Sequence, residues 1–221
     1  MTTSRQLSSP TSWLIVGLFA LLCGVAFVTT LGAFLDQSTQ ALSAPPVEPI
    51  NINQLLIRPF LLWVGIAALL VLPLITARPR ATFAGALALY AVMLLAPLTL
   101  VATLFLFGAP EWGSVTTGFV GLLLMGAAFI SAALFISSLA TSPMAAGFAT
   151  FAVALILVAA AWLARVGTPD AQPLFRYLSV GEGLDDFAKG VVDTGHVVAC
   201  LTITALGLFL TRQVVEQRSA D

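Results

Sequence analysis

Residues 13–35 read WLIVGLFALLCGVAFVTTLGAFL, an apolar run without a charged side chain. A helix needs about 20 predominantly apolar residues to cross about 30 Å of bilayer hydrocarbon. The run is longer than the core of a signal peptide, and no clear small-residue cleavage site follows it. We therefore expect it to be a retained first membrane span.

The same pattern recurs along the chain. Of its 221 residues, 59% are hydrophobic and only 9% are charged, whereas soluble domains carry roughly 25% charged residues. The apolar runs are continuous rather than alternating, which favours helices over strands. The sequence thus predicts an all-α membrane protein, one transmembrane domain over residues 1–221. Its six-helix bundle is expected to span about 12–35, 59–77, 81–107, 114–139, 144–164 and 196–211.

The connections between these spans alternate in length. Residues 78–80 and 140–143 form tight turns, whereas 36–58 and 165–195 are long and polar. Lys and Arg are denser near the chain ends and the tight turns, and most acidic residues fall in the long connections. The positive-inside rule then predicts a multi-pass protein with both termini in the cytoplasm and the long connections outside.

The second long connection has an amphipathic pattern. Its apolar residues recur at helical spacing, first Leu174, Tyr177 and Leu178 and then Leu184, Phe187 and Val191. Gly181 and Gly183 interrupt the pattern between the two groups. This pattern predicts two short amphipathic helices on the outer side. They either lie on the membrane interface or cap the bundle.

Motifs for several reaction classes are missing from the sequence. It has no phosphate-binding GxxxxGK[ST] loop, no HExxH, no GxSxG and no paired-cysteine motif. Ionisable side chains are essentially absent from the spans, which weighs against ion-coupled carriers, pumps and intramembrane proteases. A net charge of −1 argues against a nucleic-acid partner. We expect no enzyme activity, catalytic residue, cofactor or metal in this chain.

Three local features have both a structural and a functional interpretation. Ala145 and Ala149 form a small-xxx-small pair, which favours close helix packing over a subunit interface. Asp185 and Asp186 could hold a metal or a substrate, but the polar side of an amphipathic helix is the favoured interpretation. For His196, at the start of the last span, a structural role is favoured over ligation.

Four segments, in this order and spacing, match a family pattern: residues 9–13 (SPTSW), 72–78 (LPLITAR), 118–139 (GFVGLLLMGAAFISAALFISSL) and 177–192 (YLSVGEGLDDFAKGVV). They resemble the permease subunits of ABC-2 type transporters, in the group of the gliding-motility and nitrous-oxide-reductase-maturation permeases. The resemblance implies a bacterial inner-membrane subunit that forms the translocation pathway or moving part. It also implies a second permease copy or homologous permease, and a cytoplasmic ABC ATPase partner that binds ATP.

The family's coupling region is shortened here. The family has a long acidic coupling helix after the second span, whereas Arg78 is followed by Pro79 and Arg80 and then by the third span. The turns left to engage an ATPase contain Arg78, Pro79, Arg80, Thr141 and Ser142. Two alternatives stay open: a reduced permease that couples through these turns, or a non-coupling half-permease or membrane scaffold.

An outer-side protein partner is the other expected contact, besides the lipid bilayer itself. The residues expected to meet such a partner are Glu182, Asp185, Asp186 and Phe187. A less favoured hypothesis is a membrane enzyme acting on lipid, with Asp185 and Asp186 as metal ligands.

Overall fold

The computed structural model describes residues 10–43, 51–77, 82–108, 110–166 and 180–218, and these contain helices and no strand. The helices are α2 (Pro10–Ser43), the π-helix η1 (Asn53–Ile57), α3 (Arg58–Thr76), α4 (Phe83–Phe107), α5 (Trp112–Leu139), α6 (Pro143–Val166), α8 (Val180–Ala188) and α9 (Thr194–Arg218). Six helical segments are long and apolar enough to cross a membrane. The predicted all-α six-helix transmembrane bundle is therefore confirmed.

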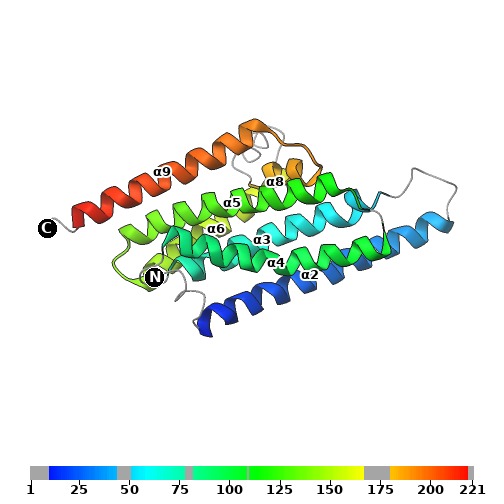
Figure 1. Cartoon of the computed structure of the whole chain (residues 1–221), viewed down its shortest axis with the longest axis horizontal. Coiled ribbons are helices and arrows are strands. Elements are labelled where there is room, and N and C mark those ends of the chain that lie inside the picture. Colours follow the sequence, from blue (N-terminus) through cyan, green and yellow to red (C-terminus); the bar gives the residue numbers. More distant parts are fainter. Residues whose placement is uncertain (1–9, 44–50, 78–81, 109, 167–179, 219–221) are drawn as a thin grey trace.

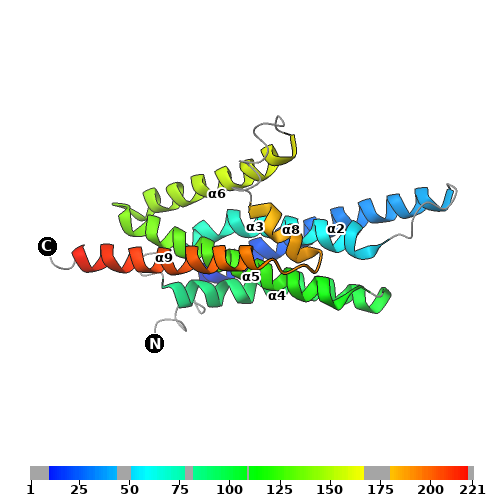
Figure 2. The same ribbon diagram turned by 90° about the horizontal axis from the view of Figure 1, so that it is seen from above.

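Helices α3 and α5 form the centre of the bundle (Figures 1 and 2). Of the most apolar stretch of each span, 61% is buried in α3 and 56% in α5, against 17% in α2 and 6% in α9. Helix α2 packs on α3 and α4, and α9 packs chiefly on α5. Helix α6 contacts α3 and α5 but diverges from the bundle toward its C-terminal end (Figure 2). The outer helices therefore leave most of their apolar surface exposed on the outside of the bundle.

The spans alternate in direction along the chain (Figure 1). Helices α3, α5 and α9 all begin at the end of the bundle where α8 lies, which we call the α8 end. Helix α2 begins and α9 ends at the opposite end, which we call the terminal end. The short 140–143 connection between α5 and α6 also lies at the terminal end.

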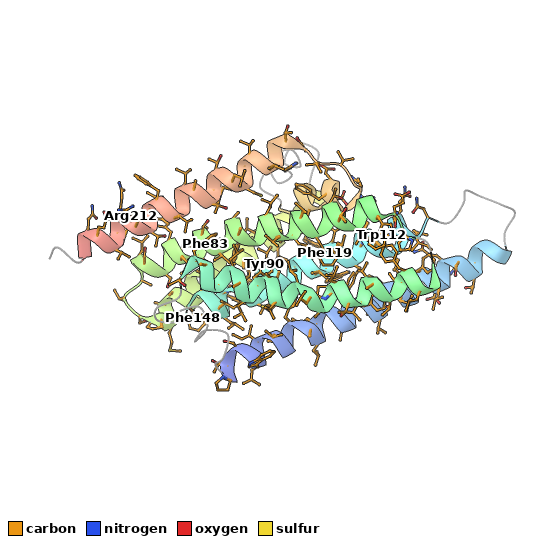
Figure 3. All side chains as sticks on the ribbon, in the orientation of Figure 1. Phe83, Tyr90, Trp112, Phe119, Phe148 and Arg212 are labelled. Carbon is orange, nitrogen blue, oxygen red and sulfur yellow. The ribbon has the colours of Figure 1, made fainter. Side chains whose placement is uncertain are left out.

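Tyr90 holds α4 against α5 (Figure 3). A Cβ atom added at Gly126 of α5 would lie only 2.1 Å from Tyr90 Cε1, so the ring fills the space that a side chain would need. The Tyr90 hydroxyl donates a hydrogen bond to the carbonyl oxygen of Leu122 at 2.8 Å. Tyr90 is fully buried, and this hydrogen bond satisfies its one polar group.

Helix α9 approaches the backbone of α5 closely at Gly207. A Cβ atom there would lie 2.8 Å from Ser131 Oγ and 2.9 Å from the Ser131 carbonyl carbon. The Ser131 hydroxyl is also 3.3 Å from the carbonyl oxygen of Ile203, which makes a polar contact between the two helices. Because the backbone of α5 cannot rotate away as a side chain can, position 207 accepts only glycine without a shift of α9.

The helix bounds lie close to those expected, except at two ends. Helix α2 runs to Ser43, past Asp36 where a loop was expected, because no Gly or Pro in residues 36–43 interrupts it. Helix α9 runs to Arg218, beyond the apolar run. There Arg212 Nε lies 2.7 Å from Glu216 Oε1, a pair four residues apart that supports the exposed end of the helix.

The small residues of α6 pack in a different register from the one expected. Ala145 and Ala149 lie on the exposed face of the helix. The buried series, at the same spacing, is Ala146, Thr150 and Ala154. Because successive helical residues point about 100° apart, a shift of one position moves the packed stripe to the next face.

We predict that Gly207→Leu destabilises the bundle, because the new side chain overlaps the α5 backbone. The free energy of unfolding should fall by about 1–3 kcal/mol, measured as a lower thermal midpoint in detergent micelles. The matched control is Gly24→Leu, at an α2 position where a Cβ atom meets nothing within 4 Å. There the midpoint should stay or rise, since Leu is the better helix former by about 0.5–1 kcal/mol. Equal effects of the two changes would contradict the close approach of α9 to α5.

Candidate functional site

Helix α8 is docked into the bundle through its apolar side. Leu184, Phe187 and Ala188 are buried, and α8 packs on α5 and α3. The sequence left open whether such a helix lies on the interface or caps the bundle, and α8 caps it. The other expected amphipathic helix, around Leu174–Leu178, lies outside the described residues.

Glycines of the two central helices receive these side chains. A Cβ atom at Gly65 of α3 would lie 2.5 Å from Leu184 Cδ2, and one at Gly121 of α5 would lie 2.6 Å from Phe187 Cγ. A Cβ atom at Gly118, also on α5, would lie 3.7 Å from the Cα atom of Ala188. Larger residues at Gly65 or Gly121 would occupy the volume that α8 now fills.

An ion pair fastens the polar side of α8 to α3. Arg58, the first residue of α3, donates hydrogen bonds from Nε to Asp185 Oδ1 and from Nη2 to Asp185 Oδ2, the second at 2.7 Å. Lys189 Nζ lies 2.8 Å from Asp185 Oδ2. The Asp185 side chain is only 18% exposed. Such a bidentate, half-buried contact is stronger than an ordinary surface ion pair.

The charged groups at this site stabilise one another. Burial alone would raise the pKa of Asp185, but the hydrogen bonds and positive charges of Arg58 and Lys189 outweigh burial and lower that pKa below its usual value. The hydrogen bond to Asp185 raises the pKa of Lys189 in turn. Lys189 also lies 3.3 Å from Asp186, so two cations face two carboxylates in this cluster.

The segment after α8 is held against the start of α5. The Thr117 hydroxyl donates a hydrogen bond to the carbonyl oxygen of Phe187 at 2.7 Å. Gly190 has φ +85°, a left-handed conformation that glycine adopts readily. A Cβ atom at Gly190 would lie 3.3 Å from Ser114 Oγ. The chain therefore turns back along the first turns of α5 as soon as α8 ends.

A π-helix leads into the arginine of the ion pair. In η1, buried Asn53 accepts a hydrogen bond at Oδ1 from the backbone N–H of Glu111 at 3.2 Å, which ties the start of α3 to the start of α5. Segments of π-helix are rare and occur often at functional sites. Pro59 then follows Arg58 at the start of α3, where proline is well tolerated. Continuous apolar runs in the sequence gave no signal for η1.

The residues expected to meet an outer-side partner differ in how exposed their side chains are. Asp185 and Phe187 are engaged inside the chain, as described above. Asp186 is 37% exposed and is the most accessible of the described side chains in this set. Glu182 belongs to α8, but its side chain lies outside the described portion.

The residues expected to engage an ATPase are described only in part. Thr141 and Ser142 are exposed at the terminal end, between α5 and α6. Ser142 Oγ accepts a hydrogen bond from the backbone N–H of Ala145 at 3.2 Å and so caps α6. Arg78, Pro79 and Arg80 lie outside the described residues.

The acidic pair on α8 is occupied by cations of the chain. Both oxygens of Asp185 contact Arg58 or Lys189, and no group of three or more His, Cys, Asp and Glu residues suited to a metal occurs in the described part. His196 Nδ1 lies 3.2 Å from Asp193 Oδ2, and its ring lies against Gly183. This arrangement gives His196 a packing role between α8 and α9.

Comparisons with known proteins leave the family open. No protein-family model, no curated protein and no solved structure matches the chain. The functional interpretation therefore depends on the sequence segments and on the geometry described above.

We predict that Asp185→Asn destabilises the protein more than Asp186→Asn, because only the first change removes the charge held by Arg58 and Lys189. The expected loss for Asp185→Asn is about 1–3 kcal/mol. For Asp186→Asn, at a more exposed position, it is about 0.5 kcal/mol or less. Thermal unfolding of the two variants in one detergent measures the difference, and the reverse order would show that α8 is not fastened at Asp185.

Stability should also fall in acid through the same carboxylate. Its pKa is lower in the folded state, so its contribution is present above the unfolded value of about 3.9 and is lost as the pH falls through the folded value. The free energy of unfolding of the wild type should therefore decrease more steeply below about pH 5 than that of Asp185→Asn. Parallel pH profiles for the two proteins would contradict this assignment.

Proposed function

We propose that this chain is the permease subunit of an ABC-2 type transporter in a bacterial inner membrane, with both termini cytoplasmic. The observation that carries the proposal is the segment before the last span. It resembles the family's outer segment in sequence, and its residues Val180–Ala188 form α8, docked on the central helices α3 and α5. Six apolar spans support the same assignment, together with the segments that resemble the family at the start of the first span, at the end of the second and in the fourth.

Helix α5 provides a physical link between the two ends of the molecule. It carries the Thr141–Ser142 turn just beyond its C-terminal end and contacts α8 near its N-terminal end. Its 28 residues contain no proline. A displacement of the terminal end of α5 is therefore not taken up by a proline kink along the helix. A cytoplasmic ATPase that binds this turn would thereby move the α8 end, and it would supply the ATP hydrolysis that this chain lacks the motifs for.

A second candidate function is a non-coupling half-permease or membrane scaffold that anchors an outer-side protein. The shortened connection between α3 and α4 favours it, because the family's coupling helix has no counterpart there. Asp186 and Lys189, both partly exposed on the α8 end, provide charged groups for such a partner.

Purification from the native membrane in mild detergent tests the first function. The tagged chain should retain an ATPase with a phosphate-binding loop. Thr141→Cys should crosslink to that subunit through a short reagent that joins a thiol to a lysine amine. The matched control is Val191→Cys, an exposed position at the α8 end, which should give no such crosslink. Both variants are made with Cys200 replaced by alanine, because it is the more exposed native cysteine.

Two outcomes would contradict the permease assignment. One is a complex that never contains an ATPase. The other is an ATPase that crosslinks to position 191 and not to position 141. Loss of an outer-side protein from the membrane when this chain is deleted, with no ATPase recovered, would favour the scaffold.

A further inference from the structure

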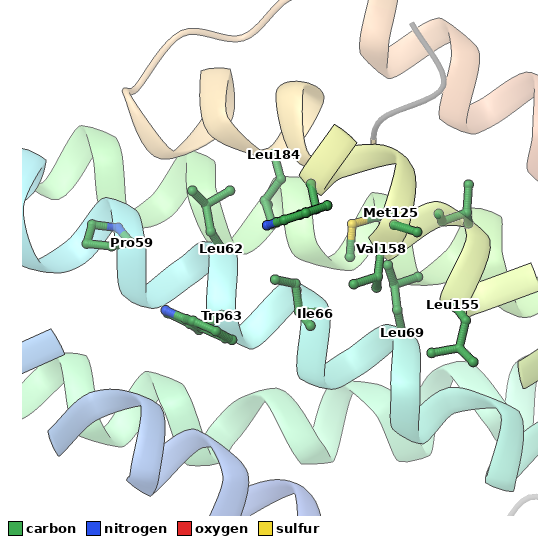
Figure 4. Close-up of a pocket in the computed structure, with 13 residues that line it drawn as sticks. Pro59, Leu62, Trp63, Ile66, Leu69, Met125, Leu155, Val158 and Leu184 are labelled. Carbon is green, nitrogen blue, oxygen red and sulfur yellow. The ribbon is translucent and has the colours of Figure 1, made fainter. Parts of the chain in front are cut away.

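An apolar groove separates α3 from α6 beside the docked helix (Figure 4). Its volume is about 700 Å³, within the range of about 300–1,000 Å³ typical of ligand sites. Ile66 and Leu69 of α3 line one wall and Val158 of α6 lines the other, with Met125 of α5 behind them and Leu184 of α8 at one end. No lining residue carries a charge.

The groove exists because α6 diverges from the bundle toward the α8 end (Figure 2). Near its start, α6 packs through small buried residues such as Ala146 and Thr150. Further along, the facing residues include Val158 and Trp162, and the space between the helices opens. Leu184 of α8 lies against Gly65 of α3 and fills part of this space, so the docking of α8 determines where the groove ends.

The surroundings of the groove define what can fill it. It lies between two membrane spans. A water molecule needs two to four polar partners, whereas the only polar groups of the lining side chains are the indole N–H groups of Trp63 and Trp162. An empty space of this size would forfeit the dispersion contacts of its lining. The apolar molecules available at this depth are the acyl chains of the bilayer.

The charged cluster at the α8 end favours a chain that carries a phosphate. Arg58 directly precedes Pro59, and Asp185 directly follows Leu184, so the cluster begins where the groove lining ends. The side chains of Arg58 and Lys189 remain 37% and 42% exposed. Their cationic groups can therefore meet a lipid phosphate while they hold Asp185.

We propose that this groove binds one acyl chain of a bilayer phospholipid, with the chain between Ile66 and Val158 and the phosphate near Arg58 and Lys189. The site goes beyond the proposed function, because it does not depend on an ATPase or on transport. The bound lipid completes the packing between α6 and the centre of the bundle.

Native mass spectrometry tests the site on the protein reconstituted in vesicles of palmitoyl-oleoyl phosphatidylglycerol and then extracted in mild detergent. Wild type should retain one phospholipid per chain. Val158→Phe fills the groove, and the lipid-bound fraction should fall about tenfold, which corresponds to about 1.4 kcal/mol of binding free energy. The matched control is Ile156→Phe, the same aromatic on the same helix at an exposed position outside the groove. It should retain the lipid.

A second pair on the opposite wall keeps the test independent of how one variant folds. Ile66→Phe should lose the lipid, and Leu74→Phe, exposed on α3 and outside the groove, should keep it. Equal retention by the groove variants and their controls would show only annular lipid and would overturn the proposal. Absence of lipid from the wild type, or a bound mass equal to a free fatty acid, would overturn it as well.

Discussion

The close approach of neighbouring helices to the small residues of α5 is the contact on which the rest of the structure depends. An apolar side chain gains little by leaving lipid for another apolar helix, so packing in a membrane relies on small residues that let helices come close. Gly121 receives α8, Gly126 receives Tyr90 of α4, and Ser131 lies against Gly207 of α9. Three elements distant in sequence thus share one central helix, which explains why α5 and its partner α3 are more buried than the other spans.

The α8 end combines this apolar packing with charge. Leu184 packs against Gly65 of α3 and also lines the α3–α6 groove. Its neighbour Asp185 accepts hydrogen bonds from Arg58. A change at one of these contacts therefore alters the others, because the ion pair positions Leu184 and Leu184 limits the length of the groove. In a permease this arrangement would connect the movement of α5 to the lipid-facing surface of α6. In a scaffold it would keep α8 fixed beneath a partner.

Hydropathy predicted the spans well because lipid imposes the same length and polarity on every helix that crosses it. The limits of α2 and α9 were less predictable, since residues beyond the membrane can continue a helix without being apolar. The docking of α8 was predictable only as one of two alternatives. Its ion pair joins residues 127 positions apart, and no periodicity reports such a contact. The glycines that receive α8 were visible in the sequence, Gly65 without another small residue four positions away and Gly121 close behind Gly118, but the pair Ala145 and Ala149 was singled out instead.

Disulfide formation between α8 and α5 tests the docking of α8 most directly. A Cβ atom at Gly118 of α5 lies 3.7 Å from the Cα atom of Ala188 of α8, so the two Cα atoms lie within the limit of about 6.8 Å for a disulfide. A Cβ atom at Gly113 meets nothing within 4 Å. With Cys23 and Cys200 replaced by alanine, the rate of intrachain oxidation in native membranes is compared for two cysteine pairs. The account predicts rapid oxidation of Gly118→Cys with Ala188→Cys, and slow oxidation of Gly113→Cys with Ala188→Cys. Equal rates for the two pairs, or no disulfide in the first, would contradict it.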